Sequence, residues 1–199
     1  MAITKIDANS FDLTDDYAFT GTISGAGGLV KLANINHSGA STFSIDGYFS
    51  STYDLYKLHF WAGEATTNTH LKMRVNQGGT AQTGSSYYYA IQGSKRYSSS
   101  DLAQHTGGWG QDHGIITWNG VGESTHDGAV IIDITIPNPL GTTYDKGWHQ
   151  LFSTFDGSSY STHTAQCLYA NNSAISGFTI FSSNSSNFIL TGALYGVAT

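Results

Sequence analysis

The stretch HLKMRVNQ, residues 70–77, alternates between apolar and polar side chains along most of its length. Leu71, Met73 and Val75 would point to one side of an extended chain, and the polar residues between them would point to the other. This period of two predicts a β-strand with one buried and one solvated face.

Similar segments follow one another along the chain. In AVIIDITIPNP, residues 129–139, every second position from Val130 to Ile136 is apolar, and Pro137 ends the strand because proline has no N–H to donate. We expect about ten strands to form an antiparallel β-sandwich of jelly-roll type, with a hairpin at the C-terminal end. The other segments are STFSID, YDLYKLHFW, YYYAIQ, GIITW, WHQLFSTF, TAQCLYA and the hairpin pair ISGFTIF and FILTGALYGV.

The composition agrees with an all-β chain and excludes several functions. Charged residues make up 11% of the chain, against roughly 25% in typical soluble domains. Lys and Arg number 8 against 14 Asp and Glu, and the net charge of −6 leaves no basic patch for nucleic acid. No apolar run is long enough to span a membrane. The lone Cys167 excludes an internal disulfide, and we expect it in the core.

Residues 1–27 differ from the rest and end in a glycine-rich hinge. We expect them to form an extended arm, and residues 28–199 to form the β-sandwich domain. The alternative is that the arm supplies an ordinary edge strand of the same domain. Its apolar and acidic side chains suit a segment that lies on another surface, and the candidate docking residues are Ile6, Phe11, Leu13, Asp15, Asp16, Tyr17 and Phe19.

The segment FILTGALYGV, residues 188–197, is apolar on both faces, and no Asp, Glu, Lys or Arg follows Asp156. A strand that is apolar on both faces belongs in the middle of a sheet, with something packed against each side. In a two-layer sandwich the second face would meet another protein, so we expect an oligomer. The candidate interface residues are Phe188, Ile189, Leu190, Leu194, Tyr195 and Val197.

The sequence lacks the motifs of common enzymes. Glu64 and Glu123 do not lie in strands with a second acid two or four positions away, as paired carboxylates for glycoside hydrolysis would require. No G-x-S-x-G nucleophile motif occurs. The tightest group of candidate metal ligands has no known metal-binding spacing, so we expect surface hydrogen bonding there, with no metal, cofactor or enzyme activity. This group is His105, Asp112, His113, His126 and Asp127.

The longest expected loop is residues 93–112. Loops carry binding sites more often than the elements that they connect. Tyr97, Trp109 and Asp112 are the candidates for binding a glycan there, through ring stacking and hydrogen bonding. The competing interpretation, which we favour, is that Trp109 folds back and plugs one end of the sandwich.

Three segments are similar to those of a known family: LTDDYAFTGT at 13–22, STYDLY at 51–56 and GALYG at 192–196. With the strands between them, they resemble a family of small virion proteins of tailed bacteriophages, especially marine ones. The resemblance covers nearly the whole chain and implies a structural component of the virion, with a β-sandwich displayed on the particle. The resemblance assigns no catalytic residues to this chain. It leaves the location open, because the pattern occurs both at tail-fibre ends and in stand-alone virion proteins.

Three functions remain open. A capsid decoration protein would be made in the host cytoplasm, bind the major capsid protein or another virion protein with its arm and associate with itself as a homotrimer. A receptor-binding tail or fibre-tip protein would recognise a host surface glycan. A free carbohydrate-binding or carbohydrate-degrading protein would depend on acids such as Asp112 or Asp127. We favour decoration, because an arm and one sandwich leave no room for a fibre shaft and a tail-docking domain.

Overall fold

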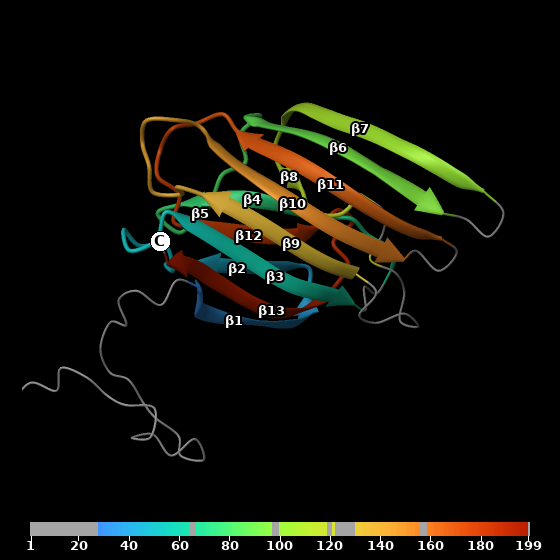
Figure 1. Cartoon of the computed structure of the whole chain (residues 1–199), viewed down its shortest axis with the longest axis horizontal. Coiled ribbons are helices and arrows are strands. Elements are labelled where there is room, and N and C mark those ends of the chain that lie inside the picture. Colours follow the sequence, from blue (N-terminus) through green and yellow to red (C-terminus); the bar gives the residue numbers. More distant parts are fainter. Residues whose placement is uncertain are drawn as a thin grey trace, which may run out of the picture.

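The computed structural model describes residues 28–63, 67–96, 100–118, 121, 130–155 and 159–198. Within these ranges the chain forms strands and turns and no helix, and the strands make two stacked antiparallel sheets (Figure 1). None of the described residues belongs to a helix that could cross a membrane. The expected antiparallel β-sandwich is confirmed. All the docking residues proposed for the arm lie outside the described residues.

The larger sheet has eight strands, and we call it the large sheet. All its neighbouring strands pair antiparallel. Their spatial order is β1 (Gly28–Ala40), β13 (Phe188–Ala198), β3 (Leu55–Gly63), β9 (Val130–Pro137), β10 (Lys146–Phe155), β11 (Tyr160–Tyr169), β6 (Tyr87–Arg96) and β7 (Asp101–Gln111). The C-terminal strand β13 therefore lies between two others, as its apolar pattern predicts.

The second layer, the small sheet, packs on one face of the large sheet (Figure 1). Its strands are β2 (Thr42–Asp46), β12 (Gly177–Ser182), β4 (Leu71–Gln77) and β5 (Thr80–Ala81), with β8 (Gly114–Ile115) also paired to β4. This layer corrects the expected C-terminal hairpin. β12 pairs with β2 and β4, whereas β13 pairs in the large sheet, so the turn between them leads the chain from one layer to the other.

The core lies between the two sheets and follows the period of two. Every second residue of β9 from Val130 to Ile136 is at most 2% exposed, whereas Ile131 between them is 47% exposed. The three apolar residues of β4 are fully buried in the same cluster. Each such buried side chain contributes about 1.5–3 kcal/mol to stability. Cys167 is 1% exposed, as expected, and burial raises the pKa of its thiol to about 12.

Two edge strands depart from the sequence-based expectation. Within the expected loop at residues 93–112, Gly93–Arg96 instead end β6 and Asp101–Gln111 form the edge strand β7, which pairs with β6 from Arg96 opposite Asp101 to Tyr87 opposite Gln111. Its glycine and polar residues suggested a loop, but an edge strand tolerates them because one side of it faces solvent. β1 was not expected as a strand because its register shifts, one of them after Lys31, interrupt the alternation.

Candidate binding face

The outer face of the large sheet, which points away from the small sheet, carries the candidate site. In each strand, alternate residues point toward the core and the remaining residues point to this outer face. Outward residues on neighbouring strands face one another and form rows across the sheet. The central row crosses six strands and consists of His59, Asp133, Leu151, Thr164, Gln92 and His105.

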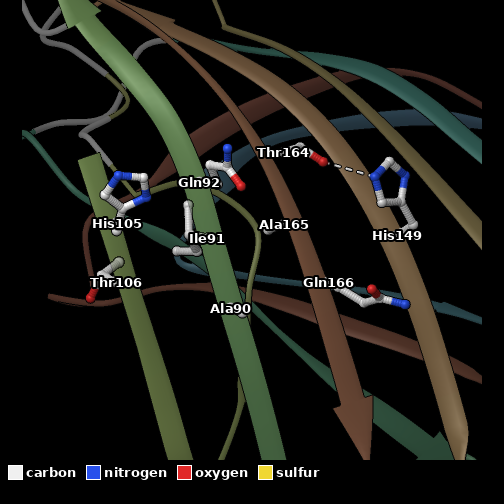
Figure 2. A pocket seen from close by; sticks show the side chains of 9 residues that line it. All are labelled: Ala90, Ile91, Gln92, His105, Thr106, His149, Thr164, Ala165 and Gln166. Atoms are coloured by element: carbon white, nitrogen blue, oxygen red, sulfur yellow. Dashed lines mark hydrogen bonds between the residues drawn. The ribbon is translucent and has the colours of Figure 1, made fainter. Parts of the chain in front are cut away.

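Shallow depressions lie along this face. One of them has a volume of about 600 Å³, within the usual range of small-molecule sites, and extends over β10, β11, β6 and β7. Figure 2 shows His105 and His149 at opposite sides of it, with Ala90 and Ala165 between them. We call this depression the polar groove. Three smaller depressions, of about 440, 440 and 290 Å³, lie on the same face.

The polar groove offers hydrogen bonds without fixed charge. Its nine lining residues include no Asp, Glu, Lys or Arg; they are Ala90, Ile91, Gln92, His105, Thr106, His149, Thr164, Ala165 and Gln166. The ring nitrogen Nε2 of His149 is 2.8 Å from the Thr164 hydroxyl, and this hydrogen bond holds the imidazole toward the neighbouring strand β11 (Figure 2). Neutral imidazole and carboxamide groups each supply both donors and acceptors.

Trp109 lies near the end of β7 and is 84% exposed. Its ring touches Tyr88 edge-on, with centroids 4.7 Å apart and an interplanar angle of 82°. The favoured interpretation of Trp109 as a plug is therefore wrong. The register of β6 and β7 shifts between Tyr87 and Tyr89, and such a bulge re-aims the side chains of the bulged strand.

Asp112 has a different environment from Trp109. Its carboxylate accepts hydrogen bonds from Arg74 of β4 and from Nδ1 of His113, the latter at 2.5 Å. Burial alone would raise the pKa of Asp112, but the hydrogen bonds from His113 and Arg74 outweigh it and lower that pKa. The Arg74 guanidinium also lies 4.3 Å from the Phe181 ring centroid. These contacts tie the chain after β7 to the small sheet, which makes Asp112 a structural residue. Tyr97 lies outside the described residues.

Toward β9, β3 and β13 the outer face carries a group of apolar side chains around the polar residues Lys57, His59 and Asp133. Trp61, Ile131, Thr191 and Gly192 line one depression there, together with His59, whose Nδ1 makes an exposed hydrogen bond with the Asp133 carboxylate at 2.5 Å. Exposed pairs of this kind contribute about 0–1 kcal/mol. We call this region the apolar half; it comprises Trp61, Ile131, Leu151, Ile189, Tyr195 and Val197.

The expected interface residues of β13 divide between two environments. Phe188, Leu190 and Leu194 are at most 1% exposed in the core of their own chain, so a second copy could not reach them. Ile189, Tyr195 and Val197 are half-buried and belong to the apolar half. The predicted interface on β13 is therefore reduced to Ile189, Tyr195 and Val197.

Of the candidate metal ligands, the structure describes His105, Asp112 and His113, and these three do not form one group. His105 lies on the outer face, His113 is bonded to Asp112, and residues 126 and 127 lie outside the described ranges. In the part of the chain that the structure describes, no three His, Cys, Asp or Glu side chains form a group that could hold a metal. On the neighbouring strands, Ala193 pairs with His59 and Leu151 pairs with Asp133. Neither of these two side chains is a nucleophile.

A scan against protein-family models found no match to this chain, and searches among curated proteins and solved structures found none either. The site is therefore defined by its geometry. Sequence reasoning missed Gln92, His149, Thr164 and Gln166. Their outward positions follow from the period of two, but only the pairing order of the strands brings them together.

Proposed function

We propose that this chain is a non-enzymatic structural protein on the surface of a bacteriophage particle, and that it is a capsid decoration protein. The observation that carries the proposal is the apolar half, where Ile131 and Leu151 are 47% and 54% exposed. Neighbouring exposed apolar side chains mark surfaces that contact other proteins. The resemblance of the sequence to virion proteins of tailed bacteriophages supports a place on the phage particle.

The proposal assigns the two expected partners to separate regions. The apolar half meets further copies of the chain, as a homotrimer, and the N-terminal arm meets the major capsid protein. Each arm contact can be weak, because linked contacts strengthen one another through effective concentration. A protein that binds only the assembled shell stabilises that shell by mass action.

A receptor-binding tail or fibre-tip protein is the second candidate. The exposure of Trp109 favours it, since a large aromatic ring in solvent suits recognition of a ligand more than attachment to a shell. Both candidates place the chain on the virion. They differ in the number of copies per particle, which is high for a decoration protein and low for a tail or fibre-tip protein.

The copy number is measured on purified particles of the phage that encodes this chain, by quantitative mass spectrometry against the major capsid protein. We expect an amount comparable to that of the capsid protein. A few copies per particle would transfer the proposal to the tail, and particles without the chain would contradict both candidates.

A further inference from the structure

Trp109 is the first of two observations that point to a ligand. Its indole is 84% exposed and meets the Tyr88 ring at an interplanar angle of 82°, so at least one broad face of the indole remains in solvent. The faces of aromatic rings are negative and attract the positive edges of C–H groups. Sugar rings present such C–H groups on a flat face, with hydroxyls around the edge. An exposed indole of this kind is suited to stacking on a sugar.

The second observation is the polar groove that begins beside this aromatic pair. Ala90 lies two residues beyond Tyr88 on β6, and Gly107 lies opposite it, two residues before Trp109 on β7. A Cβ at Gly107 would lie 2.9 Å from the Tyr89 carbonyl oxygen, so this floor position stays without a side chain. The small floor residues leave a hollow between larger polar walls.

The walls of the groove fit the hydroxyls of a neutral sugar. Gln92 and His105 are cross-strand neighbours on the β6–β7 side of the groove. His149 and Gln166 are cross-strand neighbours on the β10–β11 side. At a strand spacing of about 4.8 Å, the groove from β7 to β10 is about 14 Å wide, which accommodates a short oligosaccharide. An anionic ligand would require cations, and the nine lining residues include no Lys or Arg.

We infer that Trp109 and the polar groove together bind a neutral oligosaccharide, with one sugar stacked on Trp109 and its neighbours hydrogen-bonded between His105 and His149. This inference rests on the proposed place of the chain on the particle surface and gives that exposed surface a ligand class. A second copy of the chain is the competing occupant. It fits the apolar half better, because the groove is lined by polar groups that an apolar partner would leave unpaired.

The test uses the full-length chain on an array of neutral and acidic oligosaccharides, followed by titration calorimetry with the neutral ones that bind. We expect binding to at least one neutral oligosaccharide, and we expect Trp109→Ala to weaken it by about tenfold or more, as for an aromatic anchor. His105→Ala and Gln166→Ala should weaken it as well. Tyr48→Ala is the control, because Tyr48 is an exposed aromatic residue, 45% in solvent, before β3 at the other side of the sheet.

Three outcomes would overturn the inference. They are failure of every neutral oligosaccharide to bind, equal binding by Trp109→Ala and the unaltered chain, and dissociation of the oligomer by Trp109→Ala in sedimentation velocity. The last outcome would assign the groove to a second copy. These results are independent of the copy number on particles, so the inference and the proposed function can fail separately.

Discussion

At the scale of single residues, Tyr87 and Tyr88 are neighbours in β6 with opposite roles. Tyr87 is fully buried; its hydroxyl accepts a hydrogen bond from the Val75 N–H at 3.0 Å and donates one to the Gln82 carbonyl at 2.9 Å. Burial raises the pKa of Tyr87 above its ordinary value of 10.0, so the hydroxyl remains a hydrogen-bond donor even in alkaline solution. Because Val75 belongs to β4, this hydroxyl links the large sheet to the small one.

Tyr87→Phe removes this link, so that the buried Val75 N–H and the partly buried Gln82 carbonyl both lose the Tyr87 hydroxyl as a partner. We expect the free energy of unfolding in urea to fall by about 1–3 kcal/mol, the usual cost of such groups. Tyr88→Phe is the matched control, since it keeps the ring that touches Trp109 and should change the free energy by less than about 0.5 kcal/mol. Equal losses in the two variants would contradict the structural role of the Tyr87 hydroxyl.

At the scale of elements, the strands were predictable and their partners were less so. β4 and β9 follow from the alternation of their own side chains, because half-buried strands show that pattern directly. The placement of β12 and β13 in different sheets was not predictable, since the polar turn at 183–187 permits a hairpin or a change of layer. The row from His59 to His105 depends on six strands in the right order, and no single segment contains that information.

The apolar half predicts a further element-scale result. Ile131→Asp on β9 changes a side chain that is 47% exposed, so the chain should fold normally but lose its self-association, because an unpaired carboxylate would be buried between copies. Sedimentation velocity measures the change. Leu168→Asp on β11 is the control, since Leu168 is 38% exposed on the same face but outside the apolar half. An oligomer that survives Ile131→Asp would refute this interface.

At the scale of the whole molecule, buried histidines make stability depend on pH. Burial lowers the pKa of His70, His113 and His163 below the ordinary 6.5. The unfolded chain then binds protons more readily than the folded chain. The contribution of these histidines to the free energy of unfolding is therefore complete above pH 6.5 and is lost as the pH falls toward their pKa values in the folded chain.

We therefore expect the thermal unfolding midpoint to fall as the pH is lowered from about 7.5 to about 5. Circular dichroism follows the transition. His163→Gln should flatten this dependence, because His163 is 3% exposed, stacked on Phe152 and replaced by a group that does not titrate. A dependence as steep in the variant as in the unaltered chain would show that His163 does not contribute to it.

The arm predicts a separation of folding from attachment. Deleting residues 1–24 leaves every described strand intact, so we expect an unchanged thermal midpoint and an inability to join particles. Calorimetry and co-sedimentation with particles measure the two properties. An unfolded deletion variant would show that the arm belongs to the core of the domain, which is the alternative left open by the sequence.

The most direct test of the virion proposal is the position of the chain on intact particles. Gold-labelled antibody against the sandwich domain can be counted over head and tail in the electron microscope. Capsid decoration predicts dense labelling over the whole head. Grains confined to the tail tip would contradict decoration and favour receptor binding, and particles without label would contradict a place for this protein on the virion surface.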